Sequence, residues 1–142
     1  MNGWLVAHLA GTAVMVGFIW TIQLLSYPMM AEVPDDAFVG YETAHARRVT
    51  WLLALIAPLE VVAAAGVALF VDGVPAWLSI GAGAVLVAIW VSTALHFAPL
   101  HMRLGERFDA AQHRRLVTTN WFRTAAWTAR GAAAIAMISV AG

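Results

Sequence analysis

The chain has 142 residues, of which 62% are hydrophobic and only 11% are charged. Soluble domains carry about 25% charged residues, so this composition excludes an ordinary soluble domain and favours one integral membrane domain over residues 1–142. The formal net charge of zero argues against nucleic acid as a partner, and the absence of cysteine excludes disulfides and thiolate chemistry.

Four segments are long and apolar enough to cross a bilayer, which needs about 20 residues. Polar stretches precede the second and fourth segments, so we expect these two helices to extend beyond the membrane. The predicted fold is an all-α, four-helix transmembrane bundle. The spans are predicted at about 4–27, 49–71, 77–98 and 116–139.

The distribution of arginine predicts the orientation. All eight basic residues are arginine, and six of them flank the connections 31–48 and 101–117, whereas the opposite side has none. The positive-inside rule therefore places these connections in the cytoplasm. We expect a multi-pass protein of a bacterial-type inner membrane with both termini outside the cytoplasm. The partners left open are the lipid bilayer, a lipophilic small molecule and a second copy of the chain.

Polar residues within the spans align on one face of each helix, because an α-helix turns about 100° per residue. Lipid cannot satisfy such groups, so each stripe should face the bundle interior. Glu60 and Arg130 lie near the middle of their spans, and their opposite charges at matched depth predict a buried ion pair that holds helix register. The stripes are His8, Thr12, Gln23 and Tyr27 in the first span, Tyr41, Glu42, His45, Arg48 and Glu60 in the second span and its extension, and Asn120, Arg123, Trp127 and Arg130 in the fourth.

The pattern Glu42-x-x-His45 sets a carboxylate and an imidazole one turn apart, as in di-iron helical bundles. Only one such unit occurs, so we do not expect a complete di-iron site. Together with His96 and His101, this pair is a candidate mixed nitrogen and oxygen site for iron or copper, and two of the histidines are candidate haem ligands. Alternatively, the histidines lie at a wet helix end, where water and carboxylates satisfy them.

His96 and His101 are five residues apart, about 140° around an ideal helix. They share a face only if Pro99 bends the helix. We expect such a bend to bring both histidines to the same cytoplasmic-side pocket as His45. His113, on the cytoplasmic extension of the fourth helix, is expected to be solvated.

Arg123 lies about two turns into the fourth span, on the face that it shares with Asn120 and Trp127. A buried arginine pairs with a carboxylate or with an anionic ligand oxygen. The carboxylate candidate is Glu42, which would make a structural pair. The alternative is that Arg123 holds the oxygens of a flat, lipophilic molecule. The substrate-binding candidates are then Gln23, Tyr27, Asn120 and Trp127.

The end of the third span, STALHFAPLHMRL, and the fourth-span segment NWFRTAAWTAR resemble the anthrone-oxygenase-like family of small four-helix membrane proteins. The resemblance implies the same fold and an oxygenase or oxidoreductase activity on an aromatic substrate. The chain departs from the family pattern at His96 and His101, where the pattern has asparagine. The matching residues are Pro99, Leu100, Leu104, Asn120, Arg123 and Thr124.

We therefore expect an integral membrane oxidoreductase or oxygenase that acts on a lipophilic aromatic or quinone-like substrate. Histidines and a carboxylate would transfer protons or bind a metal, while an arginine would hold the substrate. One alternative is a small proton-coupled transporter, and another is a haem-binding accessory protein. The catalytic candidates are Glu42, His45, His96 and Arg123.

Overall fold

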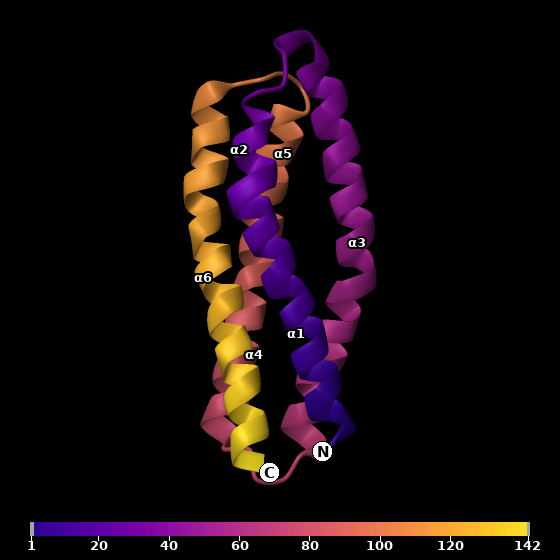
Figure 1. Cartoon of the computed structure of the whole chain (residues 1–142), viewed down its shortest axis with the longest axis vertical. Coiled ribbons are helices and arrows are strands. Elements are labelled where there is room, and N and C mark those ends of the chain that lie inside the picture. Colours follow the sequence, from indigo (N-terminus) through magenta and orange to yellow (C-terminus); the bar gives the residue numbers. More distant parts are fainter. Residues whose placement is uncertain (1, 142) are drawn as a thin grey trace.

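The computed structural model describes residues 2–141 as four helical rods that run side by side (Figure 1). Met1 and Gly142 lie outside the described residues. The part described contains only helices and their connections, so the predicted all-α bundle is confirmed. The rods are α1 (Gly3–Thr21), η1 (Ile22–Ser26) and α2 (Tyr27–Met30); α3 (Asp35–Phe70); α4 (Ala76–Ser92), η2 (Thr93–Phe97) and α5 (Ala98–Leu104); and α6 (Ala110–Ala141).

Three of the rods are long and apolar enough to cross a membrane: Gly3–Met30, Asp35–Phe70 and Ala76–Leu104. α6 is comparably long but less apolar, so its segment 116–139 remains a predicted span, although it runs alongside the other rods (Figure 1). Many large apolar side chains are exposed on the outside of the bundle. This surface suits contact with lipid, so the chain has the character of a membrane protein.

Both ends of the described chain lie at one end of the bundle, and the connections 31–34 and 105–109 lie at the other (Figure 1). We call the latter the arginine-rich end, because six of the eight arginines lie on its side of the bundle: Arg47, Arg48, Arg103, Arg107, Arg114 and Arg115. α3 diverges from α5 toward this end and makes few contacts with it.

The first and third rods each contain a π-helical segment just ahead of a proline. Proline has no N–H to donate and its ring clashes with the carbonyl four residues earlier. A π-helical turn, in which the bonds span five residues, accommodates both effects. The N–H of Tyr27, next to Pro28, donates to the carbonyl of Ile22, and that of Ala98, next to Pro99, to the carbonyl of Thr93. The side chains that follow are thereby rotated from the positions they would take on an uninterrupted α-helix.

One buried polar network joins four helices. Arg130 Nη2 on α6 donates to Glu60 Oε2 on α3 at 3.0 Å, and both side chains are fully buried. Arg130 Nη1 also donates to the Ala82 carbonyl on α4, and the Thr12 hydroxyl on α1 lies 3.1 and 3.2 Å from the two Glu60 oxygens. Gly11 permits this approach, because a Cβ there would lie 2.5 Å from Glu60 Oε1. The ion pair expected from the sequence is therefore present, and it contacts every rod.

Apolar layers lie on both sides of this network. In a bilayer such layers stabilise through close packing, since lipid is as apolar as the core. Trp127, expected to line a substrate pocket, is instead fully buried in the layer nearer the arginine-rich end. This layer, which we call the middle apolar layer, consists of Met15, Ile19, Ile56, Leu86, Ile89 and Trp127. The layer nearer the termini consists of Leu5, Val67, Ala82 and Met137.

Replacing Glu60 with glutamine should destabilise the bundle, because it leaves the charge of Arg130 buried without its partner. We expect the free energy of unfolding in detergent to fall by about 3 kcal/mol. In a double-mutant cycle, the change of both Glu60 and Arg130 to leucine should cost less than the two single changes together. Additive losses would mean that the two residues do not interact. Glu32→Gln, at an exposed carboxylate, is the matched control and should leave stability unchanged.

Candidate functional site

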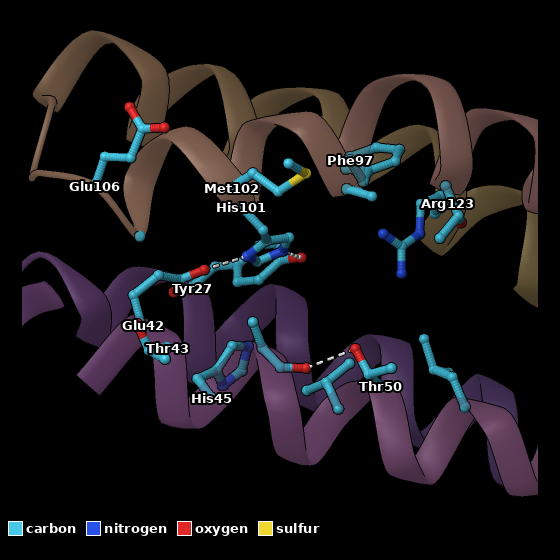
Figure 2. A pocket seen from close by; sticks show the side chains of 16 residues that line it. Tyr27, Glu42, Thr43, His45, Thr50, Phe97, His101, Met102, Glu106 and Arg123 are labelled. Carbon is cyan, nitrogen blue, oxygen red and sulfur yellow. Dashed lines mark hydrogen bonds and ion pairs between the residues drawn. The ribbon is translucent and has the colours of Figure 1, made fainter. Parts of the chain in front are cut away.

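A cavity of about 500 Å³ lies between α3 and the η2–α5 segment, at the arginine-rich end (Figure 2). It exists because α3 diverges from α5 there. Its volume is within the range of small-molecule sites, which are apolar clefts with a few polar groups that fix orientation. The walls are mostly apolar, and the ionisable or phenolic side chains among them are Tyr27, Glu42, His45, His101, Glu106 and Arg123.

Three side chains from three rods form a chain of hydrogen bonds on the cavity wall. His101 Nδ1 lies 2.5 Å from Glu42 Oε1, and His101 Nε2 lies 2.9 Å from the Tyr27 hydroxyl. An ionised carboxylate only accepts hydrogen bonds, so Nδ1 donates to Glu42 and Nε2 accepts from Tyr27. The carboxylate thereby selects the tautomer of the imidazole and leaves the tyrosine bonded to a base.

Glu42 is the buried, negatively charged end of this series of hydrogen bonds. Its side chain is fully buried, and Oε2 has no hydrogen-bond partner in residues 2–141. A buried carboxylate loses its hydration, so the short bond to His101 is its main compensation. A proton that reaches His101 would be stabilised by the carboxylate beside it.

His45 lies next to this chain of hydrogen bonds and contributes a second imidazole to the wall. Its ring centroid is 6.0 Å from that of His101 and 6.4 Å from that of Tyr27. On its other side it stacks on Tyr41, at 6.2 Å and an interplanar angle of 10°. The one-turn spacing from Glu42 explains why both residues face the cavity from α3.

His96 does not reach this cavity. Its Nε2 lies 3.0 Å from Thr119 Oγ1 on α6, and its ring packs edge-on against Phe97. The expected approach of His96 to His101 does not occur, since His96 bonds to α6 and His101 bonds to Glu42 on α3. The two imidazoles stay on different sides of the rod, as a spacing of five residues on a helix already places them. Within residues 2–141, no group of three or more His, Cys, Asp or Glu side chains is placed to hold a metal ion. The four predicted ligands are therefore not assembled here.

Arg123 reaches the cavity from α6, and only 5% of its surface is exposed. Within the described residues it has no ion pair, its Nε is buried without a partner, and its polar neighbour is the Tyr27 hydroxyl. Its guanidinium carbon lies 4.4 Å from the centroid of the Phe97 ring, a cation–π contact. The alternative of a structural pair with Glu42 is not present, and Glu42 Oε1 bonds to His101 instead.

Gln23 and Asn120 bond to each other instead of lining the cavity. Asn120 Nδ2 donates to Gln23 Oε1 at 2.9 Å, and Gln23 Nε2 donates to the Val117 carbonyl at 3.2 Å. Both side chains are buried, and Thr124 adds a longer bond to Gln23. These groups join α1 to α6, so Tyr27 alone of the four predicted substrate-binding residues lines the cavity.

His113 has a role that the sequence analysis missed. It is 7% exposed rather than solvated, and its Nε2 donates to the backbone carbonyl of Tyr27 at 2.7 Å. Asp109, which precedes α6, accepts from the N–H groups of Ala111 and Gln112, and these bonds hold the pKa of that carboxyl below its usual value. Asp109 thus fixes the start of α6 one turn before His113. The His113 side chain then holds the backbone of Tyr27 through its hydrogen bond. The available signal was spacing, because His113 continues the three-and-four pattern of the buried stripe on α6.

Changing His113 to alanine should leave the Tyr27 carbonyl without its donor. We expect a loss of about 1–2 kcal/mol in the free energy of unfolding in detergent. His113→Gln keeps a donor and should recover part of this loss, while Arg114→Gln, at the exposed neighbouring position, should have little effect. Equal stability of the alanine variant and the wild type would show that the bond contributes nothing.

These contacts describe a cavity with an oriented acid–base chain and an unpaired cation. Comparison of the chain with known protein families, with curated proteins and with solved structures finds no match.

Proposed function

We propose that the chain is an integral membrane oxidoreductase or oxygenase that removes a proton from a lipophilic aromatic or quinone-like substrate in this cavity. One observation carries the proposal: the hydrogen-bonded chain Glu42–His101–Tyr27 lies in a mostly apolar cavity beside an unpaired guanidinium. The likeness of residues 92–104 and 120–130 to the anthrone-oxygenase-like family supports it further.

Tyr27 is the proposed proton acceptor. Its hydroxyl proton moves to His101 Nε2, and the resulting phenolate takes a proton from the substrate. Glu42 stabilises the imidazolium that forms, as a carboxylate does in a serine protease triad. The substrate is left as an enolate or phenolate, whose negative oxygen Arg123 stabilises in a site of low dielectric constant.

Dioxygen is the proposed oxidant. The electron-rich anion is oxidised so that a CH₂ group becomes a carbonyl, R₂CH₂ + O₂ → R₂C=O + H₂O. One oxygen atom enters the product, and the other leaves as water with the two protons that the carbon loses. The residues of the cavity supply the proton transfer and the binding of the anion.

The position of the cavity suits a substrate that arrives through the membrane. Its rim includes Thr43 on α3 and Met102 on α5, both exposed on the outside of the bundle. A lipophilic molecule would therefore enter sideways between these helices. Because the cavity lies at the arginine-rich end, the proposed entry is from the cytoplasmic leaflet of an inner membrane.

The two other functions considered from the sequence receive less support. A proton-coupled carrier needs a polar path from the cavity to the Glu60–Arg130 pair, and the middle apolar layer lies between them. Haem ligation by His101 would require it to give up one of its hydrogen bonds, because both of its ring nitrogens are engaged.

The acid–base proposal predicts that Tyr27→Phe abolishes most activity. In membranes containing the chain, oxidation of a hydroxylated anthrone by dioxygen should have a kcat at least about 100-fold lower in this variant, with a smaller change in KM. The rate is followed by the absorbance of the quinone product. His101→Gln and Glu42→Gln should lower kcat in the same direction.

Tyr41→Phe is the matched control, since Tyr41 stacks on the neighbouring His45 and takes no part in the chain of hydrogen bonds. It should keep the wild-type rate. A Tyr27→Phe variant with wild-type kcat, or a wild-type protein that does not accelerate the oxidation, would contradict the proposed function.

The orientation predicts that reporters at the two ends of the bundle behave oppositely. A reporter fused after Ala141 should be active only if it functions outside the cytoplasm, and one inserted in the connection 105–109 only if it functions in the cytoplasm. A reporter active in the cytoplasm when fused after Ala141 would reverse the proposed topology.

A further inference from the structure

We infer that the cavity binds its ligand as an amphipathic monoanion, with the ionised oxygen on Arg123 and the apolar body between α3 and α5. The inference rests on the proposed function for the identity of the cavity as the substrate site. It adds the charge of the ligand and the direction in which it lies, and binding alone can test both.

The two buried arginines of the chain differ in one respect. Arg130 has a carboxylate, Glu60, and the carbonyl of Ala82 as partners. Arg123 is nearly as buried, but it has no ion pair in residues 2–141, and its polar neighbour is the uncharged hydroxyl of Tyr27. Arginine stays charged at any ordinary pH, so it cannot avoid the cost of burial by losing its proton. An anion in the cavity would give Arg123 the partner that Arg130 already has.

The guanidinium of Arg123 has the Phe97 ring and the Tyr27 hydroxyl as neighbours, and its Nε is buried without a partner. Phe97 covers one face of the guanidinium, at 4.4 Å from the ring centroid. Figure 2 shows the guanidinium pointing into the space between α3 and the η2–α5 segment. The N–H groups of arginine lie in the plane of the guanidinium and match oxygen anions such as carboxylates or enolates.

Neither carboxylate on the cavity wall forms an ion pair with Arg123. Glu42 is bonded to His101. Glu106 is exposed and follows the end of α5, nine residues after Phe97, which is roughly 10 Å or more along the rod. The positive charge is thus left for the ligand.

The remaining walls suit an apolar body. Val49 and Leu53 on α3 face Phe97 and Met102 across the cavity, and 72% of the surface of Met102 is exposed on the outside of the bundle. The ligand therefore lies with its charged oxygen inward and its apolar end toward the lipid. Two kinds of molecule share this chemistry, a long-chain carboxylate and the enolate or phenolate of a polycyclic aromatic.

Binding of matched fluorescent probes to the purified protein in a neutral detergent tests the inference. Anthracene-9-carboxylate and anthracene-9-methanol share the same rings and differ in charge. Parinaric acid and parinaryl alcohol form the same comparison for a linear chain. The wild type should bind at least one carboxylate about tenfold or more tightly than its alcohol, the usual size of a charge-assisted hydrogen bond.

Arg123→Gln should reduce this preference to about twofold or less while binding of the alcohol is kept, and Arg123→Lys should keep part of the preference. The exposed control Arg114→Gln should keep all of it. Leu53→Trp fills the cavity beside Arg123 and should weaken carboxylate binding about tenfold or more, which locates the site even if Arg123→Gln does not fold.

Equal binding of carboxylate and alcohol by the wild type would overturn the inference, as would a preference that survives Arg123→Gln or carboxylate binding that survives Leu53→Trp. The outcomes separate the two proposals. A preference for the linear carboxylate alone, without anthrone oxidation, supports the anion site and contradicts the aromatic oxygenase. Oxidation that depends on Tyr27, without any preference for the anion, supports the aromatic oxygenase and contradicts the anion site.

Discussion

The ion pair between Glu60 and Arg130 is the interaction around which the rods are arranged. Each charge would be costly alone inside an apolar bundle, so the two helices that carry them must stay in register. Thr12 and the Ala82 carbonyl extend the constraint to the other two rods. Because this network holds the middle of the bundle together, the rods can separate or change their helical geometry at their ends.

That freedom appears at the arginine-rich end, where α3 diverges and the first and third rods contain their prolines. A straight α-helix would carry the buried stripe of each rod directly to its end. The π-helical turns rotate the last residues instead, so that Tyr27 and His101 meet beside Glu42. His113 then holds the Tyr27 backbone from α6. The acid–base chain thus depends on the two π-helical turns, and the cavity beside it depends on the divergence of α3.

The contrast between Arg123 and Arg130 connects stability with function. Two arginines lie two turns apart on the same face of α6, and the bundle supplies a carboxylate for only one of them. The deeper one closes a structural network, and the other faces a cavity. A buried cation without a partner lowers stability, and such a cost is characteristic of groups kept for a ligand.

The sequence alone determined the four rods, the buried stripes and the ion pair, because helical periodicity and depth in a span depend only on position along one helix. It did not determine which stripe residues meet. His96 and His101 were expected together and lie apart, Glu42 bonds to His101 rather than Arg123, and Gln23 bonds to Asn120. Each outcome depends on the rotation added by a π-helical turn or on the choice among several polar partners at one depth. Only the packing of all four rods decides these, since periodicity along one helix contains no information about its neighbours.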